Sequence, residues 1–331
     1  MPSTTLKDPG WNTHIINGDV EAAVRELKAK PGRELQVHGS GQLFRWLLER
    51  DLVDELNLRL VPLVVGDGLR LFPERGQTHA LTLVESRTTP FGVTLQTYRP
   101  AGRATFGTAG GVTPALSQPH PSSTIKEERH MGKVVAGATV SLDGYIAGPN
   151  ESGFEHLFAW FAGGEFEFPS VNPEFKVRLA EPDYRYMRDV VEGIGVFVIG
   201  RRMFDLNDGW GGRHPFDKPI VVVTHSVPQP WVAAHPDAPY TFVTDGLPAA
   251  IERARAIAGD LNVIVTPGKI ASQCLELGLL DEISVDLVPV LLGSGVRFLD
   301  ELKAAPILLD GPDLLVEGSR VTHLRYQVRR S

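Results

Sequence analysis

The sequence has 331 residues, about the length of two ordinary domains, and its 42% hydrophobic and 22% charged residues are typical of a folded globular protein. A formal net charge of -7 argues against any general attraction to nucleic acid or anionic lipid. The single cysteine, Cys274, excludes an intramolecular disulfide. Since the sequence shows neither a membrane span nor a signal peptide, we expect a cytoplasmic protein that contacts no membrane.

An internal repeat organises the chain. Residues 41–70 and 268–297 align without gaps at a constant offset of 227, and 12 of the 30 aligned positions are identical. The identical positions include Val61–Pro62, which aligns with Val288–Pro289. The match continues to Tyr98 and Tyr326 after one inserted residue.

Differences in composition divide the chain into three parts. Residues 1–100, named copy one here, correspond only to the C-terminal part of residues 131–331, named copy two. Residues 101–130 are rich in Gly, Pro, Ser and Thr and indicate a flexible linker. We therefore expect a partial domain fused to a complete one, with the copies pairing either within one chain or across a homodimer.

Short apolar segments alternate with helical patterns through copy two. The expected strands and helices, in chain order, are 134–140 (strand), 182–192 (helix), 196–199, 220–223 and 240–243 (strands), 247–258 (helix), 262–265 (strand) and 269–277 (helix). This alternation predicts an α/β fold with a mostly parallel sheet covered by helices on both faces. The last two strands, at 283–288 and 323–329, have no helix between them and are expected to add antiparallel edge strands.

Four segments of copy two directly follow predicted strands, where α/β sheets bind ligands. After the first strand comes Asp143, which is either a turn carboxylate that accepts backbone N–H bonds or a functional carboxylate. After the second come Gly200, Arg201 and Arg202. Guanidinium groups at a helix start bind phosphate well, although these two could equally pair with neighbouring aspartates on the surface.

The third and fourth segments carry hydroxyl groups and small residues. Thr224, His225 and Ser226 follow the strand at 220–223 and could hold a phosphate, although a loop histidine is more often merely exposed. Thr266 to Ile270 form a strand-to-helix turn compatible with cradling a pyrophosphate. A short turn of this kind is unspecific by itself.

Together these segments resemble the dihydrofolate reductase-like superfamily, in particular proteins related to the reductase domain of the riboflavin-pathway bifunctional deaminase-reductase. The resemblance is carried by SLDGYIAG, IGRRMFD, VVVTHSVP and GLLDEISVDLVPVLLGSGVRF. It covers copy two almost completely, and copy one from about residue 11 to residue 100.

The resemblance implies a dihydrofolate reductase-like fold and NADPH as cofactor. It places Gly200, Arg201 and Arg202 at the cofactor phosphates, and Thr224, His225 and Ser226 near the adenosine 2′-phosphate. It also places the turn at the pyrophosphate, through Thr266, Pro267, Gly268, Lys269 and Ile270. Asp143 is implied near the substrate and nicotinamide, as the candidate catalytic and substrate-binding carboxylate.

Two departures from the family pattern bear on function. Thr266–Pro267 stands where family members carry Gly-Gly, and proline removes an N–H donor from the expected phosphate turn. Because an X-Pro bond adopts the cis form at low cost, we expect a cis bond here, as in the resembled reductases. Copy one lacks counterparts of the first three segments, so we expect it to be structural or degenerate.

The segment from residue 151 to residue 173 is expected to be a loop rich in aromatic side chains. These side chains, among them Phe158 and Trp160, could line a pocket for a flat heterocyclic substrate. Alternatively, they close the domain as a satellite hydrophobic cluster. No metal-ligand spacing is present in the sequence.

These features predict an NADPH-dependent reductase that transfers a hydride to a small heterocyclic or ribosylaminopyrimidine-type molecule. Riboflavin-precursor reductase and dihydrofolate reductase activities both remain open. The alternative class is a non-catalytic nucleotide-binding or self-associating module, which the Thr-Pro departure and the partial copy favour.

Overall fold

The structure is a computed structural model that describes residues 2, 7, 13–38, 40–72, 76–104, 132–173, 175–300 and 302–330. Most of the expected linker, 101–130, therefore lies outside the described residues. Within these ranges, no helix is long and apolar enough to cross a membrane.

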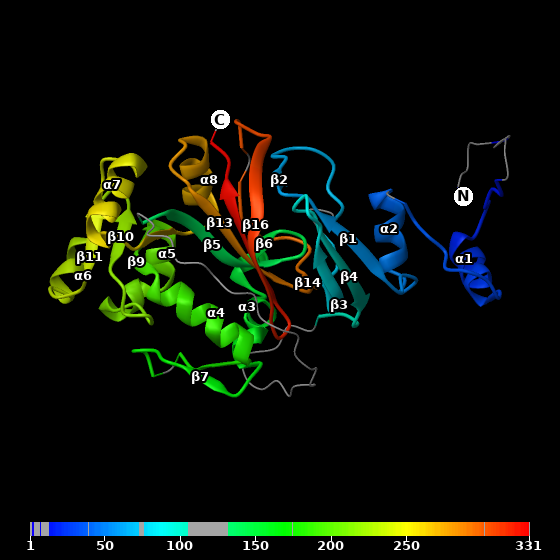
Figure 1. Ribbon diagram of the computed structural model, residues 1–331, viewed down its shortest axis with the longest axis horizontal. Coiled ribbons are helices and arrows are strands. Elements are labelled where there is room, and N and C mark those ends of the chain that lie inside the picture. Colours follow the sequence, from blue (N-terminus) through cyan, green and yellow to red (C-terminus); the bar gives the residue numbers. More distant parts are fainter. Residues whose placement is uncertain are drawn as a thin grey trace.

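A nine-stranded sheet forms the centre of the molecule (Figure 1). In spatial order its strands are β11 (Tyr240–Val243), β10 (Ile220–Val223), β9 (Ile194–Gly200), β12 (Asn262–Val265), β5 (Val134–Ser141), β13 (Glu282–Val288), β17 (Thr322–Val328), β16 (Ile307–Glu317) and β2 (Leu63–Val64). The first six run parallel to one another, and each of the last three is antiparallel to its neighbour. The expected α/β class with a mostly parallel sheet is confirmed. The expectation of two antiparallel edge strands was wrong: 283–288 (β13) runs parallel to β5, and although 323–329 (β17) is antiparallel, both strands lie inside the sheet because β16 and β2 extend it.

The sheet separates two layers because its side chains alternate between faces. One face packs against α7 (Leu247–Ala258) and α8 (Lys269–Glu276), and this contact forms the main hydrophobic core. The other face carries α4 (Glu181–Glu192), whose Tyr186 stacks on His323 of β17. Three short helices complete copy two: α3 (Phe154–Leu157), α5 (Arg201–Leu206) and α6 (Gln229–Ala234).

Copy one contributes a second, four-stranded sheet and two helices. The helices are α1 (Val20–Ala29) and α2 (Gly41–Leu48), and the sheet order is β1 (Leu56–Leu60), β4 (Thr94–Pro100), β3 (His79–Thr88) and β14 (Val290–Leu291). β14 belongs to copy two, whereas β2 of copy one lies in the central sheet. Each copy thus places a two-residue strand in the sheet of the other copy.

The two exchanged strands make equivalent contacts. Leu81 donates its N–H to the carbonyl of Pro289 at 2.8 Å, and Leu309 donates its N–H to the carbonyl of Pro62 at 3.1 Å. Pro62 and Pro289 are equivalent at the offset of 227, and Leu81 and Leu309 are equivalent once the inserted residue is counted. The contact between the copies is therefore an approximate twofold exchange.

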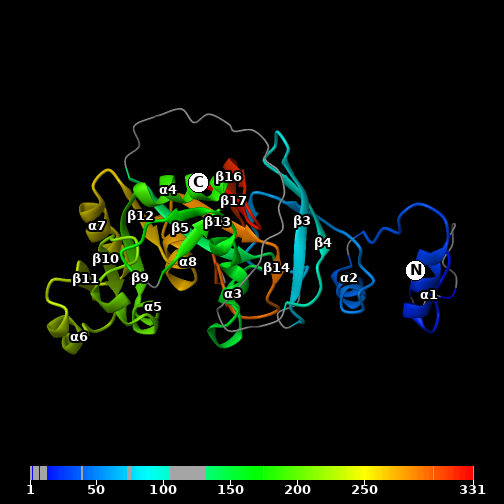
Figure 2. The same cartoon turned by 90° about the horizontal axis from the view of Figure 1, so that it is seen from below.

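The first helix of copy one lacks the sheet on which its counterpart packs. α1 aligns with the core helix α7 at the same offset, yet none of its residues is buried. Residues 34–38 align with β12 but belong to no strand, because copy one has no counterpart of β5 and β9, the neighbours of β12. Figures 1 and 2 both show α1 standing apart from the sheets.

We expect residues 131–331 expressed alone to fold, because nearly all of the main core comes from copy two. The fragment should unfold at a lower urea concentration than the full chain, since β14 and β16 lose the strands β3 and β2. Circular dichroism during urea titration measures this difference. An unfolded fragment, even with the newly exposed Leu291 replaced by Gln to limit aggregation, would show that copy one completes the core.

Candidate functional site

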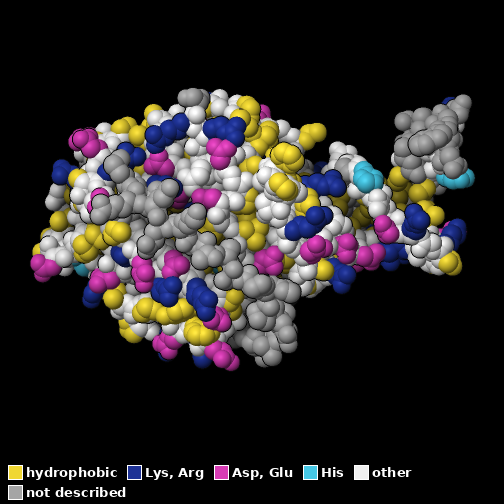
Figure 3. Space-filling model, in the orientation of Figure 1, with side chains coloured by type: hydrophobic (Ala, Val, Ile, Leu, Met, Phe, Trp, Pro, Cys, Tyr) yellow, Lys and Arg dark blue, Asp and Glu magenta, His cyan; other side chains and the backbone are white. Residues whose placement is uncertain are grey.

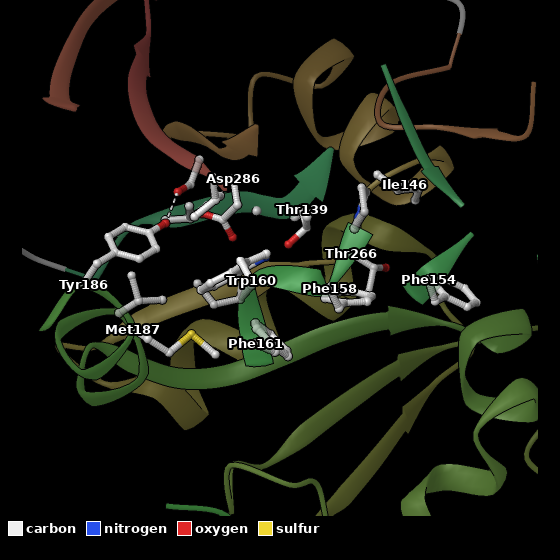
Figure 4. Close-up of a pocket in the computed structure, with 18 of the residues that line it drawn as sticks. Thr139, Ile146, Phe154, Phe158, Trp160, Phe161, Tyr186, Met187, Thr266 and Asp286 are labelled. Carbon is white, nitrogen blue, oxygen red and sulfur yellow. Dashed lines mark hydrogen bonds between the residues drawn. The ribbon is translucent and has the colours of Figure 1, made fainter. Parts of the chain in front are cut away.

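A cleft runs along the sheet face that carries α4, at the carboxyl ends of the parallel strands (Figure 4). Ten of the eleven predicted cofactor residues line it: Gly200, Arg201, Arg202, Thr224, His225, Thr266, Pro267, Gly268, Lys269 and Ile270. They converge because β10, β9 and β12 are adjacent and parallel, so that their following loops meet at one edge. The predicted residue Ser226 does not line the cleft, but its backbone carbonyl accepts hydrogen bonds from Arg201 and Thr224.

Arg201 ties two of these loops together. Its Nη1 donates to the carbonyl of Ser226 at 3.0 Å, and its Nε donates to Asp205 Oδ1 at 2.8 Å. Thr224 Oγ1 donates to the same Ser226 carbonyl at 2.9 Å. Arg201 thereby fixes the loop after β10 against α5 and leaves a guanidinium beside it.

Arg202 makes a different contact, with the 3₁₀ turn at Pro149–Glu151. Its guanidinium pairs with Glu151, with Nε lying 3.1 Å from Oε1. The Arg202 side chain is largely exposed. A cofactor phosphate at Arg202 would compete with this weak surface ion pair.

The turn after β12 has few free N–H donors for a phosphate. Thr266 donates its N–H to Val198, Gly268 donates its N–H to Phe298, and Pro267 has none to donate. The donors left for an anion are the first-turn N–H groups of α8, beside the Lys269 ammonium. The cis peptide bonds among the described residues precede Pro306 and Pro312, so the expectation of a cis bond at Thr266–Pro267 was wrong.

Asp143 lies in the turn between β5 and β6 (Tyr145–Ala147), and it is not among the residues that line the cleft. Its Oδ1 accepts bonds from the Ser141 hydroxyl at 2.6 Å and the Leu292 N–H at 3.1 Å, and its Oδ2 accepts from the Gly293 N–H at 2.7 Å. The carboxylate therefore joins the turn to the loop after β14. This geometry supports the turn-carboxylate alternative and gives no support to a catalytic or substrate-binding role.

The aromatic segment is more ordered than the loop expected from its sequence. It contains α3, a 3₁₀ turn at Ala159–Ala162 and the strand β7 (Phe166–Phe168). Phe158 and Trp160 both line the cleft, and Trp160 also belongs to a buried hydrophobic cluster with Leu157. The same residues thus close the domain and form one wall of the cleft, while the binding of a flat heterocyclic substrate there stays a prediction.

A buried charged group at the floor of the cleft was missed in the sequence. His323 of β17 has no exposed surface and lies between two carboxylates: Nδ1 is 2.7 Å from Asp286 Oδ1, and Nε2 is 3.1 Å from Asp183 Oδ1. Asp286 and His323 are direct partners in the β13–β17 register, and Asp286 lines the cleft. The sequence held one signal for this group: the predicted strands 283–288 and 323–329 each contain a titratable residue, Asp286 and His323, within an apolar pattern.

Two opposing effects set the charge of this group. Burial lowers the pKa of His323, but attraction to Asp286 and Asp183 and the hydrogen bonds to both outweigh burial and raise the pKa to about 9. The imidazole is therefore protonated at neutral pH, between two carboxylates. Burial also raises the pKa of Tyr186, the residue stacked on this imidazole, so its hydroxyl stays neutral.

Charges of both signs are mixed over the described part of the face shown in Figure 3. The cleft is mixed in the same way: Arg201, Arg202 and Lys269 line it together with carboxylates such as Glu151 and Asp286.

Comparisons with known proteins place the sequence in a family. A family model described as the RibD C-terminal domain matches residues 4–95 and 132–309. The uncharacterized protein YyaP of Bacillus subtilis (strain 168) is 34% identical over 79 residues, which make up 24% of this chain and 42% of YyaP. This chain thus matches less than half the length of that curated relative.

Two solved structures are more distant in sequence. A putative riboflavin biosynthesis protein from Shewanella sp. PV-4 is 20% identical, with a TM-score of 0.43 over 60% of this chain and 99% of that chain. A dihydrofolate reductase from Enterococcus faecalis, complexed with NADP(H), is 14% identical, with a TM-score of 0.35 over 61% of this chain and 99% of that chain. Because the two segments matched by the family model make up well over half of the sequence, the protein belongs to the RibD C-terminal domain family.

Proposed function

We propose that this protein is a reductase that binds NADPH in the cleft and transfers a hydride to a small heterocyclic or ribosylaminopyrimidine-type substrate. One observation carries the proposal: three segments assigned to the cofactor from sequence line a single cleft at the ends of three adjacent parallel strands. Family membership supports a reductase-like protein. Ligands of open α/β sheets bind at this edge.

The residues present fit a dinucleotide phosphate. Arg201 and Lys269 supply positive charge, and the first turn of α8 supplies N–H donors. NADPH would supply the hydride, while the protein supplies orientation and excludes water.

The substrate end of the cleft lies over β5 and β13. Its floor carries the small residues Gly137, Thr139 and Ser284, which leave room for a flat ring. Phe158 and Trp160 form an adjacent wall. The hydride acceptor would thus lie between the phosphate-binding loops and the Asp286 carboxylate.

Titration of the full-length chain with NADPH, followed by nicotinamide fluorescence, tests the proposal. NADPH oxidation is then measured after adding a ribosylaminopyrimidine or dihydrofolate. Binding with substrate-dependent oxidation supports the reductase. Absence of NADPH binding would favour the self-associating module instead.

We expect the protein to prefer NADPH over NADH, and Arg201→Ala to remove most of that preference. Arg201 holds the loop assigned to the 2′-phosphate, and one charge-assisted contact is worth about 1.5 to 3 kcal/mol, or about 10- to 150-fold in affinity. Dissociation constants for both cofactors measure the effect. Arg202→Ala is the matched control, because Arg202 contacts Glu151 rather than this loop, and it should alter the ratio less. Equal affinities of the parent protein for the two cofactors would refute the assignment.

We expect Pro267→Gly to tighten NADPH binding by about 10-fold, since it restores one N–H donor worth about 1.5 kcal/mol to the turn. Isothermal titration calorimetry on the parent and the variant gives the comparison. Pro90→Gly, in the β3–β4 turn of copy one, controls for the general effect of replacing a proline. An unchanged affinity in Pro267→Gly would mean that the pyrophosphate does not contact this position.

Because His323 is buried with a raised pKa, we expect the free energy of unfolding to fall at alkaline pH. The pKa of His323 is about 9 in the folded protein against 6.5 as the ordinary value, so the folded state binds more protons between these values. The contribution of protonated His323 to the free energy of unfolding is complete below pH 6.5 and is lost as the pH rises through 9. Urea unfolding from pH 6 to pH 10 should show this fall, and His323→Gln should flatten it. If that variant does not fold, NMR titration of the His323 ring in the parent decides, and a midpoint at or below 6.5 would contradict the prediction.

A further inference from the structure

The indole of Trp160 has a buried N–H without a partner. The side chain is 1% exposed, and its Nε1 makes no hydrogen bond with any described residue. A buried donor left unpaired costs about 1 to 3 kcal/mol, so it marks a place where an acceptor from outside the protein is favoured. Trp160 lines the cleft, and Figure 4 shows its nitrogen turned toward Thr139 and Asp286.

An acceptor of fixed charge faces the same space. Asp286 lines the cleft from β13, and its side chain is 18% exposed. His323 Nδ1 lies 2.7 Å from its Oδ1, and Asp183 holds the other side of the imidazole. His323 is therefore a positioning residue that fixes the Asp286 carboxylate.

The pair selects among ligand chemistries. An apolar ring would leave the Trp160 N–H unpaired, and a carboxylate ligand would meet the negative charge of Asp286. An amidinium group would pair with Asp286 but would offer no acceptor to the indole. A neutral group with a carbonyl beside an N–H, as in a lactam or imide, satisfies both residues.

We propose that Trp160 and Asp286 are specificity-determining residues of the cleft: the indole N–H donates to a ring carbonyl of the substrate, and the Asp286 carboxylate accepts from the adjacent ring N–H. This assignment rests on the proposed reductase function, because it concerns the substrate end of the same cleft. A site built around such bonds strongly rejects analogues that lack the bonding groups.

The test uses three matched two-ring probes: 2-quinolone, 1-methyl-2-quinolone, which lacks the N–H, and naphthalene, which lacks the N–H and offers no acceptor. Each is titrated into the full-length protein with saturating NADPH and without it, while the indole N–H resonances are followed by ¹H–¹⁵N NMR. Loss of one resonance in Trp160→Phe assigns the Trp160 signal.

We expect 2-quinolone to shift the Trp160 resonance and to bind about 5- to 150-fold more tightly than naphthalene, the range given by one buried donor finding an acceptor. Trp160→Phe should remove this advantage. Asp286→Asn should reduce the preference for 2-quinolone over its methylated form. Trp46→Phe, on α2 of copy one with Arg50 stacked over its ring, is the matched control and should change neither affinity.

NADPH affinity is measured in the same samples. This measurement separates the proposed reductase function from the proposed recognition by Trp160 and Asp286. Loss of NADPH binding in the parent protein would overturn the reductase, whereas the order of probe affinities tests only the recognition pair. Equal affinity for the three probes, a Trp160 resonance that does not move, or no binding of any probe would overturn the assignment of Trp160 and Asp286.

Discussion

The parallel register of β10, β9 and β12 is the constraint on which the cleft depends. Parallel pairing makes successive strands end at the same edge, so loops separated by many residues meet there. Arg201 adds a direct link between two of these loops through the Ser226 carbonyl. A register shift of one residue in β10 would turn Thr224 to the other face and remove it from the site.

The same dependence on neighbouring strands explains the shape of copy one. Its sheet of β1, β4 and β3 packs against α2 and pairs with β14, and Phe44, Leu81, Tyr98 and Leu291 form a shared core. Residues 34–38 have no such cover, and Leu35 and Val37 are exposed there. Local sequence alone thus does not make residues 34–38 a strand, since their counterpart β12 is held between β5 and β9.

Most of the copy two fold could be predicted because its strands are short apolar runs separated by clear helix patterns. The predicted strand 220–223 and helix 247–258 have the observed bounds. The strand β16 was missed, because its Asp310–Pro312 bulge interrupts the apolar pattern. Pairing with β17 and β2 overrides that weak local signal.

The clustering of the candidate cofactor residues in one cleft could be predicted because their segments directly follow adjacent parallel strands. Asp143 shows the limit, because its sequence position is the same whether the carboxylate faces a ligand or the backbone of another loop. The contacts with Leu292 and Gly293 join positions 149 and 150 residues away, which no local pattern reveals. The Asp183–His323–Asp286 group likewise joins α4, β17 and β13, and depends on their packing.

The two ends of the cleft carry different charged groups. Arg201 and Lys269 line the loop end, while the Asp286 carboxylate lines the floor end, with the imidazolium of His323 and then Asp183 behind it. Anionic groups of a dinucleotide are attracted to the first end and repelled from the second. A neutral ring with donor and acceptor groups suffers neither effect and can occupy the floor. Under the proposed function, this arrangement would place the phosphates of the cofactor at the loop end of the cleft and a neutral substrate ring at the floor.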